Sequence, residues 1–442
     1  MKISGRALST IVCIIAIFIF ATVAEAALDR ERLTIGGEVR ERYEFRDDAD
    51  FNKVVDDALS FISSRIRLHA GYEVTPDLVI FFQMQDSRLF GSETSTASNE
   101  KNLDLHQGYL QLKNLGPWVL TLGRQEMIYG DQKLVGNFGW SNIGRSFDGI
   151  KMGYDTGRVR TDLWLATIRK FANTGADPTF VPTPTVPSVS NRKEQTFFGM
   201  YTTYSGLPEV SIEPYVLFLW DTGSGGLITD PAAQDQRRVT LGLRLAGKAM
   251  AESIDYTAEG AYQLGGIQSK DIAAYAGAVK LGYNFTPGLP GRLGIEFDYA
   301  SGDDNPADGD FKTFENLFPT NHIHYGYMDY VGWRNMQDLR FSLGVKPTQT
   351  ASISLDYHLF WLAREADHWY AASGRIFRST PAGNSEKELG QEIDLVGYVV
   401  IKEKFRLEGG YGHFYPGQYA ETNFPGASDD SDFVYLQAGV SF

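Results

Sequence analysis

Four arginines fall into two pairs whose spacing suits the binding of anions. Arg40 and Arg42 form one pair, and Arg65 and Arg67 form the other. In a β-strand, residues i and i+2 point to the same face, so each pair would place two guanidinium groups side by side. Guanidinium groups bind carboxylates through two parallel hydrogen bonds. The two pairs therefore predict either an anion-attracting strip or a structural ladder in which each arginine pairs with an acid such as Glu38.

Histidines and acidic runs give weaker signals. His322 and His324 could contribute to a metal site, but no third ligand is fixed by spacing. The acidic run at 303–310 resembles a calcium loop, yet it departs from the EF-hand pattern at Ala307 and has Phe314 at the twelfth position. No spacing nominates a Ser/His/acid set. We predict a chain that is not an enzyme and uses no metal or cofactor, and calcium binding by the 303–310 loop stays an open alternative.

The N-terminal segment has the pattern of a secretory signal peptide. Lys2 and Arg6 precede an apolar run from Ile11 to Val23, and small residues follow at Ala24 and Ala26. The alternative is a membrane anchor, but a span needs about 20 apolar residues and this run is shorter. We therefore expect a signal peptide at residues 1–26 and an exported mature chain at 27–442. Export would remove the sole cysteine, at position 13.

Nearly all of the mature chain has the alternation of half-buried β-strands. Between Leu33 and Phe45 apolar residues occupy mostly odd positions, and charged residues occupy even ones. The same alternation recurs around residues 62–74, 239–245, 293–299, 339–345, 353–359 and 434–442. Short turns alternate with long polar connections such as 130–144 and 301–334. This organisation predicts about eighteen strands joined by short periplasmic turns and long extracellular loops.

The alternative to a membrane barrel is a large soluble all-β protein. A barrel of that width has an interior too wide for side chains to fill, so its polar face must line water and its apolar face must meet lipid. Open sheet edges cannot lie in hydrocarbon, so the sheet must close. The 46 glycines and the aromatic content of 13% fit tight turns and aromatic girdles. We predict an all-β transmembrane antiparallel β-barrel in a Gram-negative outer membrane.

The net charge of the chain and its distribution restrict the classes of partner that it can bind. A net charge of −14 argues against nucleic acid as a partner, since phosphate binding needs a basic face. Acids and bases on the predicted lumen face nearly balance, so the acidic excess belongs to loops and turns. The basic residues that we expect to line the pore and attract anions are Arg40, Arg42, Arg65, Arg67, Arg160, Arg238, Arg244, Lys280 and Arg340.

Several long segments resemble the alginate-export family of outer-membrane β-barrel proteins. They are GRQEMIYGDQKLVG at 123–136, WSN at 140–142, GRSFD at 144–148, TFENLFPTNH at 313–322, LGQEIDL at 389–395 and GGYGHF at 409–414, together with the C-terminal Phe442. The resemblance implies a barrel of about eighteen strands whose arginine-lined pore passes an anionic uronate polymer. It also implies pore-lining roles for Arg124 and Arg145, and periplasmic secretion proteins as partners.

These observations favour a passive outer-membrane channel for anionic saccharides, with export of an alginate-like exopolysaccharide as the specific form. Its partners would be outer-membrane lipid and an anionic oligo- or polysaccharide. Lumen arginines would lower the barrier for carboxylates, and acidic neighbours would keep binding weak enough for release. Two alternatives stay open: a general porin for small solutes, and an outer-membrane enzyme or surface adhesin built on the long loops.

Overall fold

The computed structural model describes residues 29–52, 57–93, 95–96, 102–169, 194–222, 235–286, 288–424, 426 and 429–442. The predicted signal peptide at 1–26 lies outside the described residues. In the described ranges, no helix has the length and apolar character needed to cross a membrane.

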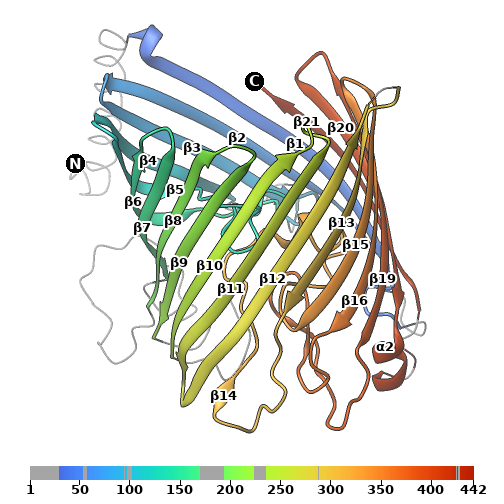
Figure 1. Cartoon of the computed structure of the whole chain (residues 1–442). Coiled ribbons are helices and arrows are strands. Elements are labelled where there is room, and N and C mark those ends of the chain that lie inside the picture. Colours follow the sequence, from blue (N-terminus) through green and yellow to red (C-terminus); the bar gives the residue numbers. More distant parts are fainter. Residues whose placement is uncertain are drawn as a thin grey trace, which may run out of the picture.

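Eighteen long antiparallel strands form the wall of the molecule (Figure 1). They are β1 (Leu33–Asp47), β2 (Leu59–Thr75), β3 (Leu78–Leu89), β4 (Leu103–Leu115), β5 (Trp118–Gln125), β6 (Phe147–Asp155), β7 (Val159–Arg169), β8 (Gln195–Leu207), β9 (Val210–Asp221), β10 (Gln236–Ala249), β11 (Ile254–Ile267), β12 (Lys270–Phe285), β13 (Gly291–Ala300), β15 (Met336–Thr348), β16 (Ala351–Leu362), β19 (Glu388–Ile401), β20 (Phe405–Pro416) and β21 (Ser431–Ser441).

The sheet closes on itself between its first and last strands. Val39 of β1 pairs with Ile66 of β2 on one side and with Val440 of β21 on the other. Each remaining strand of the wall pairs with the next, so the wall has no open edge. Backbone hydrogen bonds also join Gly37 to the C-terminal Phe442 at 2.9 and 3.1 Å. The predicted closed barrel is confirmed.

A few short elements lie outside this wall. The two-residue β14 (Asp310–Phe311) pairs in parallel with β12, and β17 (Trp369–Tyr370) pairs with β18 (Ile376–Arg378) in a separate hairpin. Helical turns occur at η1 (Arg30–Arg32), η3 (Asn321–Ile323) and α2 (Gln418–Asn423). In Figure 1, β14 and α2 lie at one end of the barrel, and the short strand-to-strand turns lie with the C-terminus at the other. The end with the short turns is the periplasmic end in barrels of this class.

The two faces of the wall differ as the alternation predicts. Apolar side chains such as Ile35, Leu293 and Leu436 are exposed on the outer face, which in a membrane barrel meets lipid. Charged side chains such as Arg42 and Asp338 alternate with them and are buried inside the barrel. This distribution suits an apolar outside and a polar inside.

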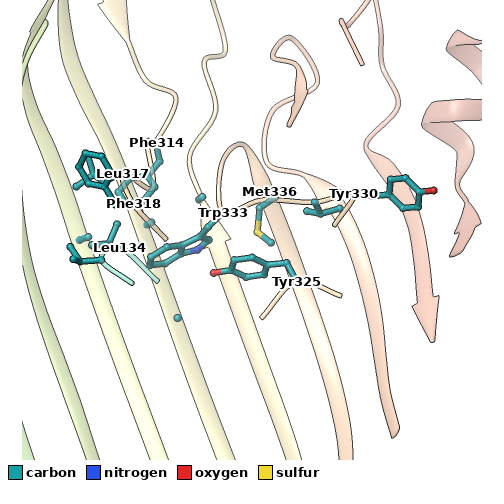
Figure 2. Close-up of a cluster of buried hydrophobic side chains, with 14 of the residues drawn as sticks. Leu134, Phe314, Leu317, Phe318, Tyr325, Tyr330, Trp333 and Met336 are labelled. Atoms are coloured by element: carbon teal, nitrogen blue, oxygen red, sulfur yellow. The ribbon is translucent and has the colours of Figure 1, made fainter. Parts of the chain in front are cut away.

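The interior holds a core that the strands alone would not form. Three long connections between strands, at 126–146, 301–335 and 363–387, contribute buried apolar side chains to it. Figure 2 shows part of this cluster, with Leu134 of the first connection near Leu317 and Phe318 of the second. The sequence predicted all three connections as long extracellular loops, whereas each contributes side chains to the core inside the barrel.

Candidate functional site

Two inward-folded segments run side by side inside the barrel. We call residues 126–146 the plug loop and residues 301–335 the second loop. Val135 of the plug loop forms a parallel β-bridge with Phe318 of the second loop. The N–H of Gly136 donates to the carbonyl of Phe318 at 2.8 Å, and the N–H of Phe318 donates to the carbonyl of Leu134 at 3.0 Å. The two loops therefore form one interior unit.

A buried ion-pair group fixes the plug loop to strand β13. The Lys133 ammonium lies 2.7 Å from Oδ1 of Asp298 and 3.0 Å from Oε1 of Glu296. It also donates to the Tyr325 hydroxyl at 3.2 Å. Burial by itself would lower the pKa of Lys133, but the two carboxylates hold it above its usual value. The ammonium is thus kept charged inside the barrel.

A second group fixes the plug loop to strand β10. The Arg244 guanidinium bonds to Asp131 of the plug loop at 2.6 Å and to Glu213 at 2.9 Å. The carbonyl of Asp131 also lies 2.6 Å from Nε2 of His324. Burial holds the pKa of His324 well below its usual value, so this histidine is neutral. Arg244, predicted as a lumen residue, therefore also positions the plug loop.

The four paired arginines come together on the inner wall, and all four meet the plug loop. Arg40 donates to the carbonyls of Gly139 at 3.0 Å and Ser141 at 3.1 Å. Arg65 donates to the same two carbonyls at 3.0 and 2.9 Å and pairs with Glu38 at 2.6 Å. Both guanidinium groups thus bind residues 139–141, and Arg65 also binds an acid of the wall.

Arg42 and Arg67 extend this contact. Arg42 pairs with Glu44 at 2.7 Å and donates to the carbonyl of Trp140 at 2.8 Å, and its guanidinium carbon lies 3.8 Å from the Trp140 ring centroid. Arg67 donates to Gln85 at 2.6 Å and to the carbonyl of Ile143 at 3.2 Å. All four arginines are 4–7% exposed. Features of both predicted arrangements are present: the arginines gather into a strip, and wall acids and loop carbonyls take up their donors.

Arg145 holds the two loops together through carbonyl oxygens. Its Nη1 donates to the carbonyls of Gly136 at 3.0 Å, Phe318 at 2.5 Å and Pro319 at 2.7 Å. Burial lowers the pKa of Arg145 to about 10. The resemblance implied a pore-lining role, and the structure places this arginine at the seam between the loops.

Arg124 differs from the other predicted residues in the direction that it faces. Leu122, two residues before Arg124 on β5, pairs with Ile150, whose side chain is exposed on the outer face. Arg124 itself pairs in register with Asp148. The two side chains form an ion pair at 3.0 Å. Because alternate residues share a face, Arg124 lies on the outer face of β5. Its role inside the pore, carried over from the family resemblance, does not agree with this placement.

The remaining predicted residues face the interior in different surroundings. Arg238 is fully buried and donates to Gln263 at 2.8 Å. Arg340 bonds to Asp356 at 2.9 Å. Lys280 lies 3.7 Å from Glu296. Arg160 is the most open of these cations, with a side chain that is 66% exposed.

Two cavities follow the inner wall from β5 to β10. One, of about 520 Å³, begins near Gly116 and Asp155 at the short-turn end, and the other, of about 270 Å³, reaches Tyr129 of the plug loop. Both are lined by Lys151 and Arg160. They form one path that leads from the periplasmic end to the plug loop, and we call this path the basic cavity.

Lys151 and Arg160 are the cations that both parts of the basic cavity share. In the described part of the chain Lys151 forms no ion pair, and the nearest carboxylate oxygen to Arg160 is that of Asp162 at 3.8 Å. Tyrosine hydroxyls cover the wall acids: Tyr129 donates to Asp162 at 3.0 Å, and Tyr201 donates to Glu213. Asp162 and Glu213 are therefore occupied, whereas Arg160 is exposed and Lys151 is half-buried, with no ion pair in the described residues. Asp155, at the short-turn end, is an exposed acid of the same lining.

Several of these functional residues were not predicted. Lys133 and Tyr129 lie in a connection, where strand alternation gives no direction for a side chain. Their signal was the segment at 123–136 that carries the family resemblance. In the 303–310 run, Lys312 places its ammonium 2.7 Å from Asp304 and 3.2 Å from Asp308, where the calcium alternative would need a cation.

Comparison with known proteins agrees with this architecture. The chain is similar to Pseudomonas aeruginosa OccK11 (OpdR), with a TM-score of 0.60 and 12% identity over 93% of this chain and 97% of that chain. Acinetobacter baumannii OccAB4 gives 0.59 and 12% over 93% and 98%, and Pseudomonas aeruginosa OccK8 (OprE) gives 0.61 and 10% over 93% and 98%. At such identities the likeness shows the fold alone. No curated protein matches the sequence.

A family model described as alginate export matches residues 31–433. This match spans nearly the whole barrel. The chain therefore belongs to the alginate export family and is an outer-membrane β-barrel channel of the Gram-negative cell envelope.

Proposed function

We propose that this channel passes anionic saccharides, and that an alginate-like exopolysaccharide leaving the periplasm is its cargo. The observation that carries the proposal is the basic cavity, which Lys151 and Arg160 line while the hydroxyls of Tyr129 and Tyr201 cover Asp162 and Glu213. A uronate entering from the periplasm would pass Lys151 and Arg160 before it reaches the plug loop. Family membership supports the same cargo.

The mechanism is electrostatic and passive. A cleft with low-dielectric walls and one sign of exposed charge raises the local concentration of the opposite ion. Asp162, 3.8 Å from Arg160, competes for the guanidinium and keeps the attraction weak enough for release. Conduction needs both properties, entry and escape, and the basic cavity supplies both.

The arginine strip of Arg40, Arg42, Arg65 and Arg67 is the second anion site in this proposal. Its guanidinium donors now go to carbonyls of residues 139–143 as well as to wall acids. A carboxylate forms stronger hydrogen bonds with guanidinium than a carbonyl does. Movement of the plug loop would therefore make the strip available to the cargo. Three further cations, Arg244, Lys280 and Arg340, face the same interior. Arg238 is buried in the wall.

The test of the proposal is ion selectivity in a planar bilayer. The double substitution Lys151→Ser and Arg160→Ser should move the reversal potential in a salt gradient toward cation preference. The control is Lys248→Ser, which removes an exposed ammonium paired with Glu252 at 3.2 Å near the periplasmic β10–β11 turn, outside the basic cavity. A double variant with the reversal potential of the wild type would overturn the role of the basic cavity.

A general porin for small solutes is the second candidate, and the two anchored loops favour it because they occupy the interior. The two functions differ in one measurable property. A saccharide channel is blocked by uronate oligomers in a concentration-dependent way, whereas a general porin shows weak selectivity and no block. We further propose that the channel has no catalytic role and that periplasmic secretion proteins deliver its cargo.

A further inference from the structure

A cavity of about 430 Å³ opens at the extracellular end, away from the basic cavity. It lies between the β11–β12 turn, the second loop and the 363–387 connection. Its walls include Ile267, Phe311 and Tyr370, and its polar lining includes Asp303, Asp367 and His368. A mostly apolar cleft of this size with a few polar groups is typical of small-molecule sites.

The cavity is held in shape by one carboxylate. Asp367 accepts hydrogen bonds from the Tyr370 hydroxyl at 2.8 Å and from the N–H of His368 at 2.7 Å. Its other oxygen accepts from the N–H of Asp303 at 2.9 Å and from the Thr313 hydroxyl at 2.5 Å. These bonds join the second loop to the 363–387 connection, so the lining is preorganised.

Two neighbouring carboxylates in this lining form no ion pair in the described residues, although Lys270 is near enough for its charge to act on Asp303. Asp303 and Asp367 are 3% and 5% exposed. Asp303 accepts from the N–H of Asn305 at 3.1 Å, which is a neutral donor. Lys270, the cation of the lining, gives its ammonium to the carbonyl of Pro306. Burial, with the nearby Asp367 carboxylate, raises the pKa of Asp303 more than the charge of Lys270 lowers it.

The rest of the lining suits the carbon skeleton of a bound organic cation. The Tyr370 ring already has the Arg334 guanidinium 4.1 Å from its centroid, so Phe311 is the aromatic ring of the lining that can cover the apolar part of a ligand. Nδ1 of His368 accepts the N–H of Thr380 at 3.0 Å, which makes Nε2 the protonated nitrogen of the neutral ring. Nε2 is then a donor available to a hydroxyl group. Two carboxylates, an aromatic ring and the Nε2 donor of His368 thus line the same cavity.

We propose that this cavity binds a small organic ammonium ligand of about one ring in size, such as an amino sugar. The ammonium group would lie at Asp303, a hydroxyl would meet His368, and the apolar face of the ring would lie against Phe311. The two carboxylates repel an anionic sugar, so this site is separate from the anion path and does not depend on the proposed cargo.

The direct test is calorimetric titration of the full chain in detergent with three matched sugars. Glucosamine carries the ammonium group, glucose is its neutral counterpart, and glucuronate is anionic. We expect glucosamine to bind about ten-fold or more tightly than glucose, from the usual strength of a charged hydrogen bond, and glucuronate not to bind. Equal binding of glucosamine and glucose, or no binding of glucosamine, would overturn the proposal.

A variant pair places the binding at Asp303. Asp303→Asn keeps the shape but removes the charge, and should weaken glucosamine binding about ten-fold. The control Asp308→Asn lies in the same loop, outside the cavity lining, with its carboxylate 3.2 Å from Lys312, and should leave binding unchanged. Wild-type affinity in Asp303→Asn contradicts the site. If that variant does not form a heat-modifiable barrel on gels, the three-sugar series on the wild type decides.

Discussion

Lys133 of the plug loop and Asp298 of strand β13 lie 2.7 Å apart, although 165 residues separate them in the sequence. Both side chains are buried inside the barrel, and Glu296 completes the group at 3.0 Å from the ammonium. A buried charge is tolerated when it is paired. The pair therefore fixes the plug loop against the wall.

Lys133→Met should release the plug loop. The substitution leaves Asp298 buried without its ion-pair partner, while Lys280 and Arg340 still lie 3.7 and 3.8 Å from Glu296. Breaking a buried pair of this kind costs about 3–5 kcal/mol. We expect a higher single-channel conductance and faster hydrogen exchange across residues 126–146. Lys248→Met, at an exposed ion pair, is the matched control. A conductance equal to that of the wild type would show that this pair does not hold the plug loop.

Replacing Arg40, Arg42, Arg65 and Arg67 with serine should reduce anion preference and leave the barrel folded. These side chains hold residues 139–143 as well as facing the interior, so conductance should rise in the same variant. Reversal potential and conductance are measured together in a planar bilayer. An unchanged reversal potential with raised conductance would assign the arginines a purely structural role.

Tyr129→Phe tests whether tyrosines cover the acids of the basic cavity. The change removes the hydroxyl that donates to Asp162 at 3.0 Å and leaves the aromatic stack, with its 4.6 Å centroid distance to Trp164, in place. Asp162 would then interact more strongly with Arg160, so anion preference should fall, though less than in the Lys151/Arg160 double variant. An anion preference equal to or above that of the wild type would contradict this covering role.

Asp48, just beyond the end of β1, predicts a small pH dependence of stability. Burial, and a hydrogen bond and charge repulsion with Asp429, raise its pKa to about 6 from 3.8. A raised carboxyl pKa means that the folded state favours the protonated form, so stability is highest below pH 4 and falls as pH rises through 6. The side chain is partly exposed and solvent screens its charge, so the effect should not exceed about 1 kcal/mol.

The check is the heat-induced gel shift of the barrel at pH 4 and pH 7.5. The wild type should unfold at a slightly lower temperature at the higher pH, and Asp48→Asn should make this difference smaller. Asp308→Asn, at an exposed loop carboxylate whose pKa is lowered, is the control. The same pH difference in Asp48→Asn as in the wild type would rule out Asp48 as its source.

The wall could be predicted from the sequence because each strand alternates between lipid and lumen. That alternation gave the closed antiparallel sheet, and it placed Arg40, Arg65 and Arg244 inside. It gave no information on the plug loop, since a connection without a strand period does not fix the direction of a side chain. Lys133 was therefore missed. Arg124 shows the converse, because a role taken from a motif disagreed with the outward direction that its own strand requires.

The sequence also could not show how the arginines would be shared. Their two-residue spacing brought them to one face, but residues 139–143 lie far away in the chain and reach them only because the loop folds inward. Likewise, the nearly balanced net charge of the lumen wall gave no information on where the individual charged side chains lie. The hydroxyls of Tyr129 and Tyr201 cover Asp162 and Glu213, whereas Lys151 and Arg160 have no such cover in the described part of the chain. This arrangement follows from tertiary contacts alone.

The most direct test of the central claim is the current through the wild-type channel in a planar bilayer, measured in a salt gradient with uronate oligomers added on the periplasmic side. The proposed function predicts anion selectivity and block that increases with oligomer concentration. Cation selectivity without block by uronate oligomers would contradict it.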